Sequence, residues 1–315
     1  MEILNSTGMT HRPLRMVPKP ASNRRPVIMP IAIDMPETTA AATTDLKSRL
    51  RLHQQFPSQL TDEKHDFIVY LPPMYDAEPS PQYANEGRAG DPEPDRRFPV
   101  LYMQDGQNLF DPATAFHGNC WHMGETADAL ILAGEVEPLI IVGIYNTGEH
   151  RIDEYTPVED KRLGGGQADA YGQMLVEELR PFVDRSYRTL SGTAHCGLGG
   201  SSLGGLVTLY LGLRYTWMFS KLAVMSPSVW WRNRAILKTV SKIRRKPDLK
   251  IWLDIGTKES QRALPDAREL NLTLVKKGWV EGHDLRYLEV PDAEHTESAW
   301  AARVAPMLKF LFPPK

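Results

Sequence analysis

Short apolar runs alternate with longer helical patterns along most of this chain, and that alternation limits the possible folds more than any other feature. Seven runs are rich in β-branched or aromatic side chains and have the length of strands: 66–72, 99–104, 138–145, 193–199, 221–226, 250–256 and 285–290. Strands separated by helices usually pair in parallel, and a parallel sheet needs helices on both faces. The sequence therefore predicts an α/β fold with a mostly parallel central sheet and helices on both faces.

Three segments have the pattern of helices. Apolar residues recur at the helical period in 169–187, the segment 202–215 is almost entirely apolar, and 296–312 is amphipathic. Ligands of such sheets bind beyond the carboxyl ends of the strands. The loops expected to surround one site are those after Gln104, Tyr145, Gly199, Ser226, Gly256 and Val290.

Two adjacent serines lie in the glycine-rich stretch CGLGGSSLGGL at 196–206. Ser202 fits the pattern G-x-S-x-G, whereas Ser201 has Leu203 where the second glycine should be. The motif follows a predicted strand and opens a predicted helix, which is the setting of a nucleophile on a strained turn. A phosphate loop would need Gly-Lys-Ser/Thr, which is missing here. Ser202 is the predicted nucleophile, and a tight turn without chemistry is the alternative for the motif alone.

A serine nucleophile needs a general base, and in sheets of this class the order along the chain is serine, acid, histidine. Two histidines follow Ser202, at His283 and His295. His283 precedes the last predicted strand and belongs to the wrong end of the sheet, whereas His295 follows that strand. We therefore predict His295 as the base, against the plainer interpretation of an exposed loop histidine.

The acid that orients the histidine is expected after the strand 250–256. Glu259 lies on the loop beyond that strand and is the first choice. Asp254 lies inside the strand and is the second, and Glu297 is the third.

Two backbone N–H groups are needed to stabilise an oxyanion. One is predicted at Leu203, directly after the nucleophile, and the other at Gly106 or Gln107 in the loop after 99–104. Gly106 would also let the backbone approach a substrate closely. Trp230 and Trp231 follow a strand at its carboxyl end and either line a substrate pocket or pack beneath the loop.

No metal or cofactor is expected. The stretch 117–122 offers two histidines and a cysteine, but their spacing matches no zinc pattern. The other cysteine is distant, so both are expected to be free thiols: Cys120 and Cys196.

Charge and hydropathy exclude several classes of partner. The formal charge of −2 and an isoelectric point near 6.5 give no electrostatic reason to expect nucleic acid or an anionic membrane as a partner. No apolar stretch is long enough to span a bilayer.

A twin arginine opens the short run 24–33, as in some export signals, but prolines break that run, so the cytoplasm is the expected location. The expected partner is a small-molecule ester, and the protein itself is expected to be a monomer or a homodimer.

Two segments lack a sustained hydrophobic period. Residues 1–45 are rich in Pro, Thr, Ala and Met and are predicted to be an extended or flexible arm, which leaves 46–315 as the catalytic domain. Residues 76–97 are dense in Pro, Gly and charge and are predicted to be a surface loop.

Seven stretches together resemble the esterase branch of the α/β-hydrolase fold, which includes enterochelin esterases, feruloyl esterases and S-formylglutathione hydrolase. They are VYLPPMY, FPVLYMQDGQNLFD, RIDEYTP, GLGGSSLGGL, SPSVWW, DIGTKE and EHTESAW. The resemblance covers about residue 50 to the C-terminus and implies a serine carboxylic-ester hydrolase that needs no cofactor. It also implies that Arg151, in RIDEYTP, contacts an anionic catecholate substrate. An equally plausible role for Arg151 is an ion pair with Asp153 or Glu154 that fixes the loop.

Two alternatives to ester hydrolysis stay open at this stage. One is an acyltransferase of the same fold, in which an alcohol replaces water. The other is a ligand-binding module that keeps the scaffold without catalysis, because a fold alone does not set function.

Overall fold

The computed structural model describes residues 46–75 and 96–314. The predicted arm at 1–45 and most of the predicted loop at 76–97 lie outside the described residues. The chain divides into two units, Met1–Pro30 and Ile31–Lys315, and every element below belongs to the second.

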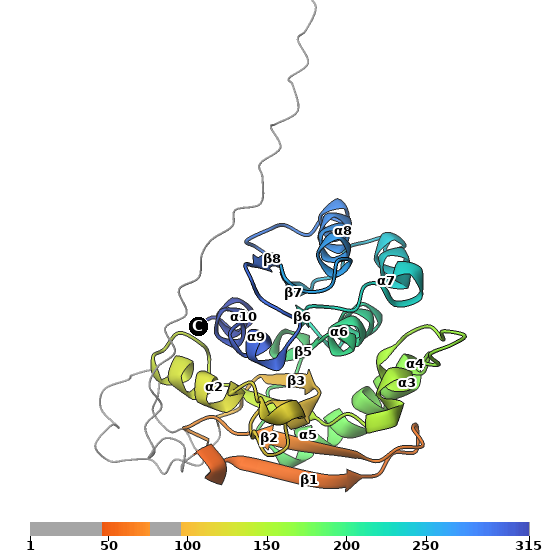
Figure 1. The fold of residues 1–315 in the computed structure, drawn as a ribbon. Coiled ribbons are helices and arrows are strands. Elements are labelled where there is room, and N and C mark those ends of the chain that lie inside the picture. Colours follow the sequence, from red (N-terminus) through yellow and green to blue (C-terminus); the bar gives the residue numbers. More distant parts are fainter. Residues whose placement is uncertain (1–45, 76–95, 315) are drawn as a thin grey trace, which may run out of the picture. The chain divides into compact units, whose positions relative to one another are not determined.

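The described residues form an eight-stranded sheet in the order β1-β2-β4-β3-β5-β6-β7-β8 (Figure 1). The strands are β1 (Leu50–Phe56), β2 (His65–Tyr70), β3 (Val100–Gln104), β4 (Ile140–Ile144), β5 (Cys196–Ser201), β6 (Lys221–Met225), β7 (Lys250–Gly256) and β8 (Leu285–Val290). β2 pairs antiparallel with both β1 and β4, and every other neighbouring pair is parallel. The predicted mostly parallel sheet is confirmed.

Helices cover both faces of this sheet, as predicted (Figure 1). One face carries α2 (Met123–Leu132), α9 (Glu297–Ala301) and α10 (Val304–Leu311). The other carries α4 (Ala168–Gln173), α5 (Arg180–Ser186), α6 (Leu203–Arg214), α7 (Trp231–Ser241) and α8 (Ala263–Lys276). The remaining helical elements are α3 (Arg151–Tyr155), the 3₁₀ turns η1 (Gly106–Asn108), η2 (Phe116–Gly118), η3 (Gly148–His150) and η5 (Thr193–His195), and a π-helical segment η4 (Met174–Leu179).

Side chains of the central strands alternate between two cores. In β3, Val100 and Tyr102 pack into one buried cluster, whereas Leu101 and Met103 pack into the other. Successive side chains of a strand point to opposite faces, so a strand covered on both faces must be apolar throughout. All residues of β3 and β4 are accordingly buried.

The structure differs from the predicted elements in several places. The first three residues of the predicted strand 193–199 form the turn η5, and β5 begins at Cys196. β1 was not predicted because it is an edge strand with exposed polar residues among its few apolar ones. The predicted helix at 169–187 contains the π-helical segment directly before Pro181, which has no N–H to continue the helical ladder. The predicted helix at 296–312 is two helices, α9 and α10, separated at Ala302 and Arg303.

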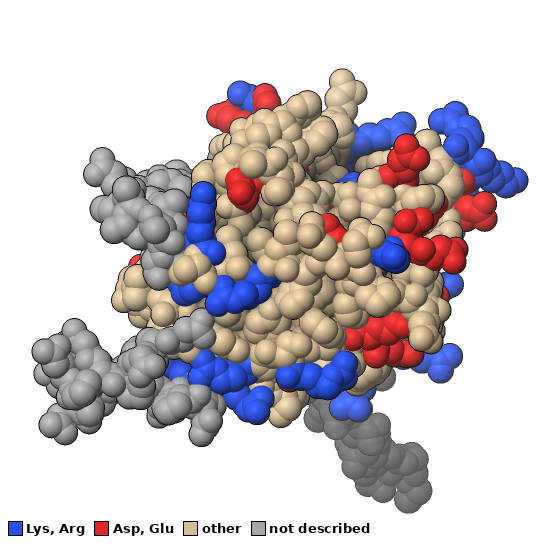
Figure 2. Space-filling model, turned by 90° about the horizontal axis from the view of Figure 1, so that it is seen from below, with Lys and Arg blue, Asp and Glu red and all other residues tan. Residues whose placement is uncertain are grey.

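Charged side chains of both signs are scattered over the face seen in Figure 2, most of which is neither acidic nor basic. This mixture agrees with the nearly balanced charge of the chain. Within the described ranges, no helix combines the length and the apolar character that a bilayer crossing requires.

Candidate active site

Ser202 lies on a sharp turn between β5 and α6. Its backbone angles, φ 59° and ψ −121°, are strained for a residue with a side chain. Two hydrogen bonds hold the turn: the Ser202 N–H donates to the carbonyl of Met225, the last residue of β6, and the Ser228 N–H beyond β6 donates to the Ser202 carbonyl. A Cβ at Gly200 would lie 2.8 Å from the Gln104 side chain, which explains the first glycine of the motif. The sequence thus forms the sharp strand-to-helix turn that the motif predicts.

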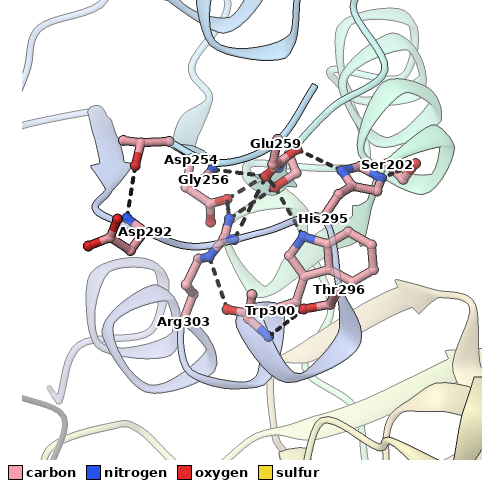
Figure 3. Close-up of polar contacts among 12 residues, drawn as sticks. Ser202, Asp254, Gly256, Glu259, Asp292, His295, Thr296, Trp300 and Arg303 are labelled. Atoms are coloured by element: carbon pink, nitrogen blue, oxygen red, sulfur yellow. Dashed lines mark hydrogen bonds and ion pairs between the residues drawn. The ribbon is translucent and has the colours of Figure 1, made fainter. Parts of the chain in front are cut away.

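Three side chains from different loops form a hydrogen-bonded chain at the carboxyl ends of the strands (Figure 3). His295 Nε2 lies 2.9 Å from Ser202 Oγ, and His295 Nδ1 lies 2.6 Å from Glu259 Oε2. Ser202 follows β5, Glu259 follows β7 and His295 follows β8. Such an arrangement can pass a proton from the hydroxyl to the imidazole while the carboxylate fixes the ring.

The Glu259 carboxylate is almost completely buried and receives several hydrogen bonds. Its Oε1 accepts from the Ser226 hydroxyl at 2.5 Å and from the Gly256 N–H at 2.9 Å. Burial alone would raise the pKa of Glu259, but the hydrogen bonds from His295, Ser226 and Gly256 together hold that pKa below its ordinary value. Glu259 is therefore ionised at neutral pH and can stabilise a protonated imidazole.

A buried polar network lies behind Glu259 (Figure 3). The Ser226 hydroxyl accepts hydrogen bonds from Trp300 Nε1 and from Arg303, both at 3.0 Å. Arg303 also pairs with Asp254 at 2.5 Å, and both side chains are fully buried. The network links the ends of β6 and β7 to α9 and α10.

The two other candidate acids have different partners. Asp254 binds Arg303 and the Trp252 indole N–H. Glu297 accepts hydrogen bonds from Asn108 and from the Trp121 indole N–H. Of the three carboxylates, Glu259 is the one that the structure brings to His295.

A cavity of about 520 Å³ opens over Ser202 and His295. Its wall combines the loop after β3 with η2, Asn146 beyond β4, α3 and the start of α9. The polar lining includes Asp105, Gln107, Asn108, Asn119, Asn146 and Arg151.

The predicted oxyanion donors lie beside this cavity. Leu203 is the first residue of α6, so its N–H has no acceptor within the helix. Gln107 lines the cavity from η1. A Cβ at Gly106 would lie 2.2 Å from the Gly143 backbone, so Gly106 is small because β4 packs against it. We expected a glycine at position 106 so that the backbone could approach a substrate closely. The structure gives a different reason, the close packing of β4 against this residue.

Arg151 lines the cavity, but its ion pair is not one of those expected from the sequence. Its guanidinium forms two hydrogen bonds to Asp105, at 2.7 and 2.8 Å, rather than a pair with Asp153 or Glu154. Asp105 directly follows β3, so the pair joins that strand to α3.

The structure does not bring the two predicted tryptophans to this cavity. Trp231 is buried in the core and donates to the Val158 carbonyl at 2.7 Å, so it packs beneath the loop. Trp230 is exposed and lies in a separate hollow with Ser260 and Arg262. Neither tryptophan lines the Ser202 cavity, so the prediction that they contact a substrate there is corrected.

The stretch 117–122 does not gather metal ligands. Cys120 Sγ lies 3.6 Å from His122 Nδ1, but across residues 46–75 and 96–314 no three His, Cys, Asp or Glu side chains form a metal-binding group.

Sequence reasoning missed Ser226, Trp300, Arg303 and Asp105. Ser226 and Asp105 each directly follow a buried strand, which was an available signal. Trp300 and Arg303 lie three residues apart and both contact Ser226, but nothing in a lone sequence names their partner.

Residues 58–311 match the model of the Esterase family, described as "Putative esterase". The chain belongs to this family. It is a carboxylic ester hydrolase with an α/β-hydrolase fold, as the sequence resemblance implied.

Known proteins similar to this esterase include one curated relative and two solved structures. The Bacillus subtilis protein YjcH, described as uncharacterized, is 28% identical over 266 residues, which are 81% of this chain and 95% of YjcH. The enterobactin esterase FES from Shigella flexneri superposes with a TM-score of 0.63 at 18% identity. The match covers 83% of this esterase and 58% of the FES chain. The ferulic acid esterase from Anaeromyces mucronatus superposes with a TM-score of 0.58 at 17% identity. The match covers 82% of this esterase and 88% of the Anaeromyces chain. These structural likenesses show the shared fold.

Proposed function

We propose that this esterase works through an acyl-enzyme on Ser202, with His295 as general base and Glu259 as the orienting acid. The observation that carries the proposal is the unbroken hydrogen-bonded chain from Ser202 Oγ through His295 to Glu259. The strained turn at Ser202, the buried carboxylate and the adjoining cavity support it.

The proposed reaction has two balanced halves. Ser202 Oγ bonds to the ester carbonyl carbon as its proton moves to His295 Nε2, and His295 then gives that proton to the departing alcohol. Water next attacks the acyl-enzyme, loses a proton to His295 and releases the acid, and the proton returns to Ser202. The N–H groups of Leu203 and Gln107 are the proposed donors to the oxyanion in both halves.

Hydrolysis is favoured over acyl transfer by the exposure of the proposed base. The side chain of His295 is 43% exposed, so water can reach the acyl-enzyme. Product analysis with and without an added alcohol measures the partition directly.

The substrate proposed is a small-molecule ester, either a siderophore-type lactone or an aryl or acetyl ester. Enterobactin esterase and ferulic acid esterase are both similar in fold, so the fold does not choose between them. Arg151 is the proposed contact to the substrate because it lines the cavity beside Ser202. Relative kcat/KM values across an ester panel rank the classes.

The test of the mechanism compares two neighbouring serines. We expect Ser202→Ala to lower kcat for p-nitrophenyl acetate by at least about a thousandfold and to abolish labelling by a fluorophosphonate. Ser201→Ala is the matched control, with an expected loss below about tenfold because Ser201 is the buried last residue of β5. Equal rates in wild type and Ser202→Ala would overturn the mechanism and favour a binding module.

A further inference from the structure

Both acidic and basic side chains line the cavity over Ser202. Three lining residues have an acidic or a basic side chain: Asp105, Arg151 and Glu297. His117 and His295 complete the titratable groups of the lining. The charge that a substrate meets there depends on how these groups compensate one another.

Arg151 is already neutralised by the protein. Asp105 is buried and binds the guanidinium through two hydrogen bonds, while Asn146 Nδ2 donates to Asp105 Oδ1 at 2.7 Å. A charge held this closely by its counter-ion attracts a further anion only weakly, although its remaining N–H groups can still donate. Arg151 is therefore a hydrogen-bond donor without an uncompensated positive charge.

Glu297 has no such counter-ion. Its two oxygens accept from the neutral donors Asn108 Nδ2 and Trp121 Nε1, and in the described part of the chain no cationic side chain forms a salt bridge with it. When Glu297 is ionised, the lining as a whole carries one uncompensated negative charge.

We propose that this cavity selects esters without a negative charge near the scissile bond, and that Glu297 is the residue that excludes the anionic ones. The inference rests on the proposed function, because the selection acts at the cavity over Ser202. Neutral aryl or alkyl esters with hydrogen-bond acceptors fit the donors of Arg151 and the neighbouring amides. An ester with a carboxylate would meet the Glu297 carboxylate in a partly desolvated space.

The exclusion depends on pH because burial raises the pKa of Glu297 to about 7. That value already includes the Asp105 charge, which also raises the pKa of Glu297, and the Trp121 N–H, Arg151 and His295, which lower it. Glu297 is neutral below this value and charged above it, so the discrimination is strongest in mildly alkaline solution. It weakens as the pH falls and Glu297 takes up a proton.

The experiment uses pairs of esters that differ by a carboxamide or a carboxylate of nearly equal size. One pair varies the acyl half (p-nitrophenyl 4-carbamoylbenzoate and p-nitrophenyl 4-carboxybenzoate), and the other varies the leaving half (4-acetoxybenzamide and 4-acetoxybenzoate). For each pair, the ratio of kcat/KM, carboxamide over carboxylate, is measured for the full chain at about pH 8.5 and about pH 6. A ratio removes differences in absolute activity between variants.

We expect the ratio at the higher pH to be roughly tenfold larger in wild type than in Glu297→Gln, for at least one pair. Lowering the pH should reduce the wild-type ratio more than that of Glu297→Gln. The comparison between the two proteins is needed because His117 and His295 also gain protons as the pH falls. Glu294→Gln, an exposed change in the same loop, is the matched control and should keep the wild-type ratio.

Ratios that are the same in wild type and Glu297→Gln for both pairs would overturn the inference. If Glu297→Gln does not fold, Glu297→Ala takes its place, because the smaller side chain admits water to the Trp121 and Asn108 donors. An absence of Ser202-dependent turnover of both carboxamide esters would instead overturn the proposed function, and this inference with it.

Discussion

The hydroxyl of Ser226 has one proton and two lone pairs, and all three are used. Trp300 Nε1 and the Arg303 guanidinium can only donate, so the hydroxyl accepts from both. Its own proton must therefore point to Glu259 Oε1, at 2.5 Å. This assignment makes Ser226 a positioning residue for the proposed triad acid.

Replacing Ser226 with alanine should reduce catalysis without removing any proposed catalytic group. We expect Ser226→Ala to lower kcat by about tenfold to a hundredfold, because a hydrogen bond to a charged group is lost. The pKa of Glu259 should rise without this donor, so the acid side of the pH–rate profile should move to higher pH. Steady-state kinetics of p-nitrophenyl acetate hydrolysis across the pH range measure both effects.

The control for this substitution lies at the other end of the same strand. Ser220 precedes β6 and donates to the Thr193 carbonyl at 2.8 Å, far along the strand from Glu259. Ser220→Ala should leave the pH–rate profile in place. The role assigned to Ser226 is wrong if both variants show the same profile as wild type.

The proposed catalytic residues were easier to predict from the sequence than the residues that hold them in place. The order of Ser202, Glu259 and His295 along the chain, each after a strand, was enough to predict that the three lie together, and the structure places them within hydrogen-bond distance. The support from Ser226 and Arg303 depends on how α10 packs across β6 and β7. Such tertiary contacts have no signal in a single sequence.

Among the elements, α10 is fixed to the sheet by a buried charge pair at its N-terminus. Arg303 precedes α10, and Asp254 lies inside β7, which explains why a carboxylate is tolerated in a buried strand. Breaking one half of a buried pair leaves the other charge without a partner.

We expect Arg303→Met to lower the free energy of unfolding by about 3–5 kcal/mol, because the Asp254 carboxylate stays buried and unpaired. Denaturant unfolding followed by tryptophan fluorescence gives this value. Lys309→Met removes an ion pair between α10 and Glu135 that is exposed on both sides, and should cost about 1 kcal/mol or less. Similar losses for the two variants would contradict a special contribution of the buried pair.

Elements with a strong hydrophobic period were predictable, and those set by other forces were not. The strands 250–256 and 285–290 have the bounds that their sequence runs indicate, although β7 is buried between β6 and β8 whereas β8 is a half-buried edge strand. β1 owes its strand conformation to backbone pairing with β2. The amphipathic pattern of 296–312 does not reveal the break between α9 and α10 at Ala302 and Arg303, although Pro306 has no N–H to donate to the Ala302 carbonyl.

At the scale of the whole molecule, residues before the family match still belong to the folded unit. The match begins at residue 58, but Leu46 is buried in one of the two cores and β1 extends the sheet. Arg49 forms a nearly buried ion pair with Asp128 of α2. These contacts place the described residues from Leu46 onward in the folded unit, while the domain start at residue 46 stays a prediction.

A chain that begins at residue 58 should therefore be less stable than one that begins at residue 46. We expect its thermal midpoint to fall by about 10 °C, because the β1 pairing is lost and Asp128 is left without Arg49. Differential scanning calorimetry of both truncations and of the full chain provides the measurement. Equal midpoints for the two truncations would place the domain start at residue 58 instead.

The position of the Ser226 network along the chain has a consequence for synthesis. Ser202 leaves the ribosome about a hundred residues before His295, Trp300 and Arg303 do. Ser202 is therefore synthesised long before His295, the proposed base. It also precedes Trp300 and Arg303, which bind the Ser226 hydroxyl. If His295 acts as the proposed base, a product that ends ahead of this residue should be inactive, because it carries Ser202 without that base.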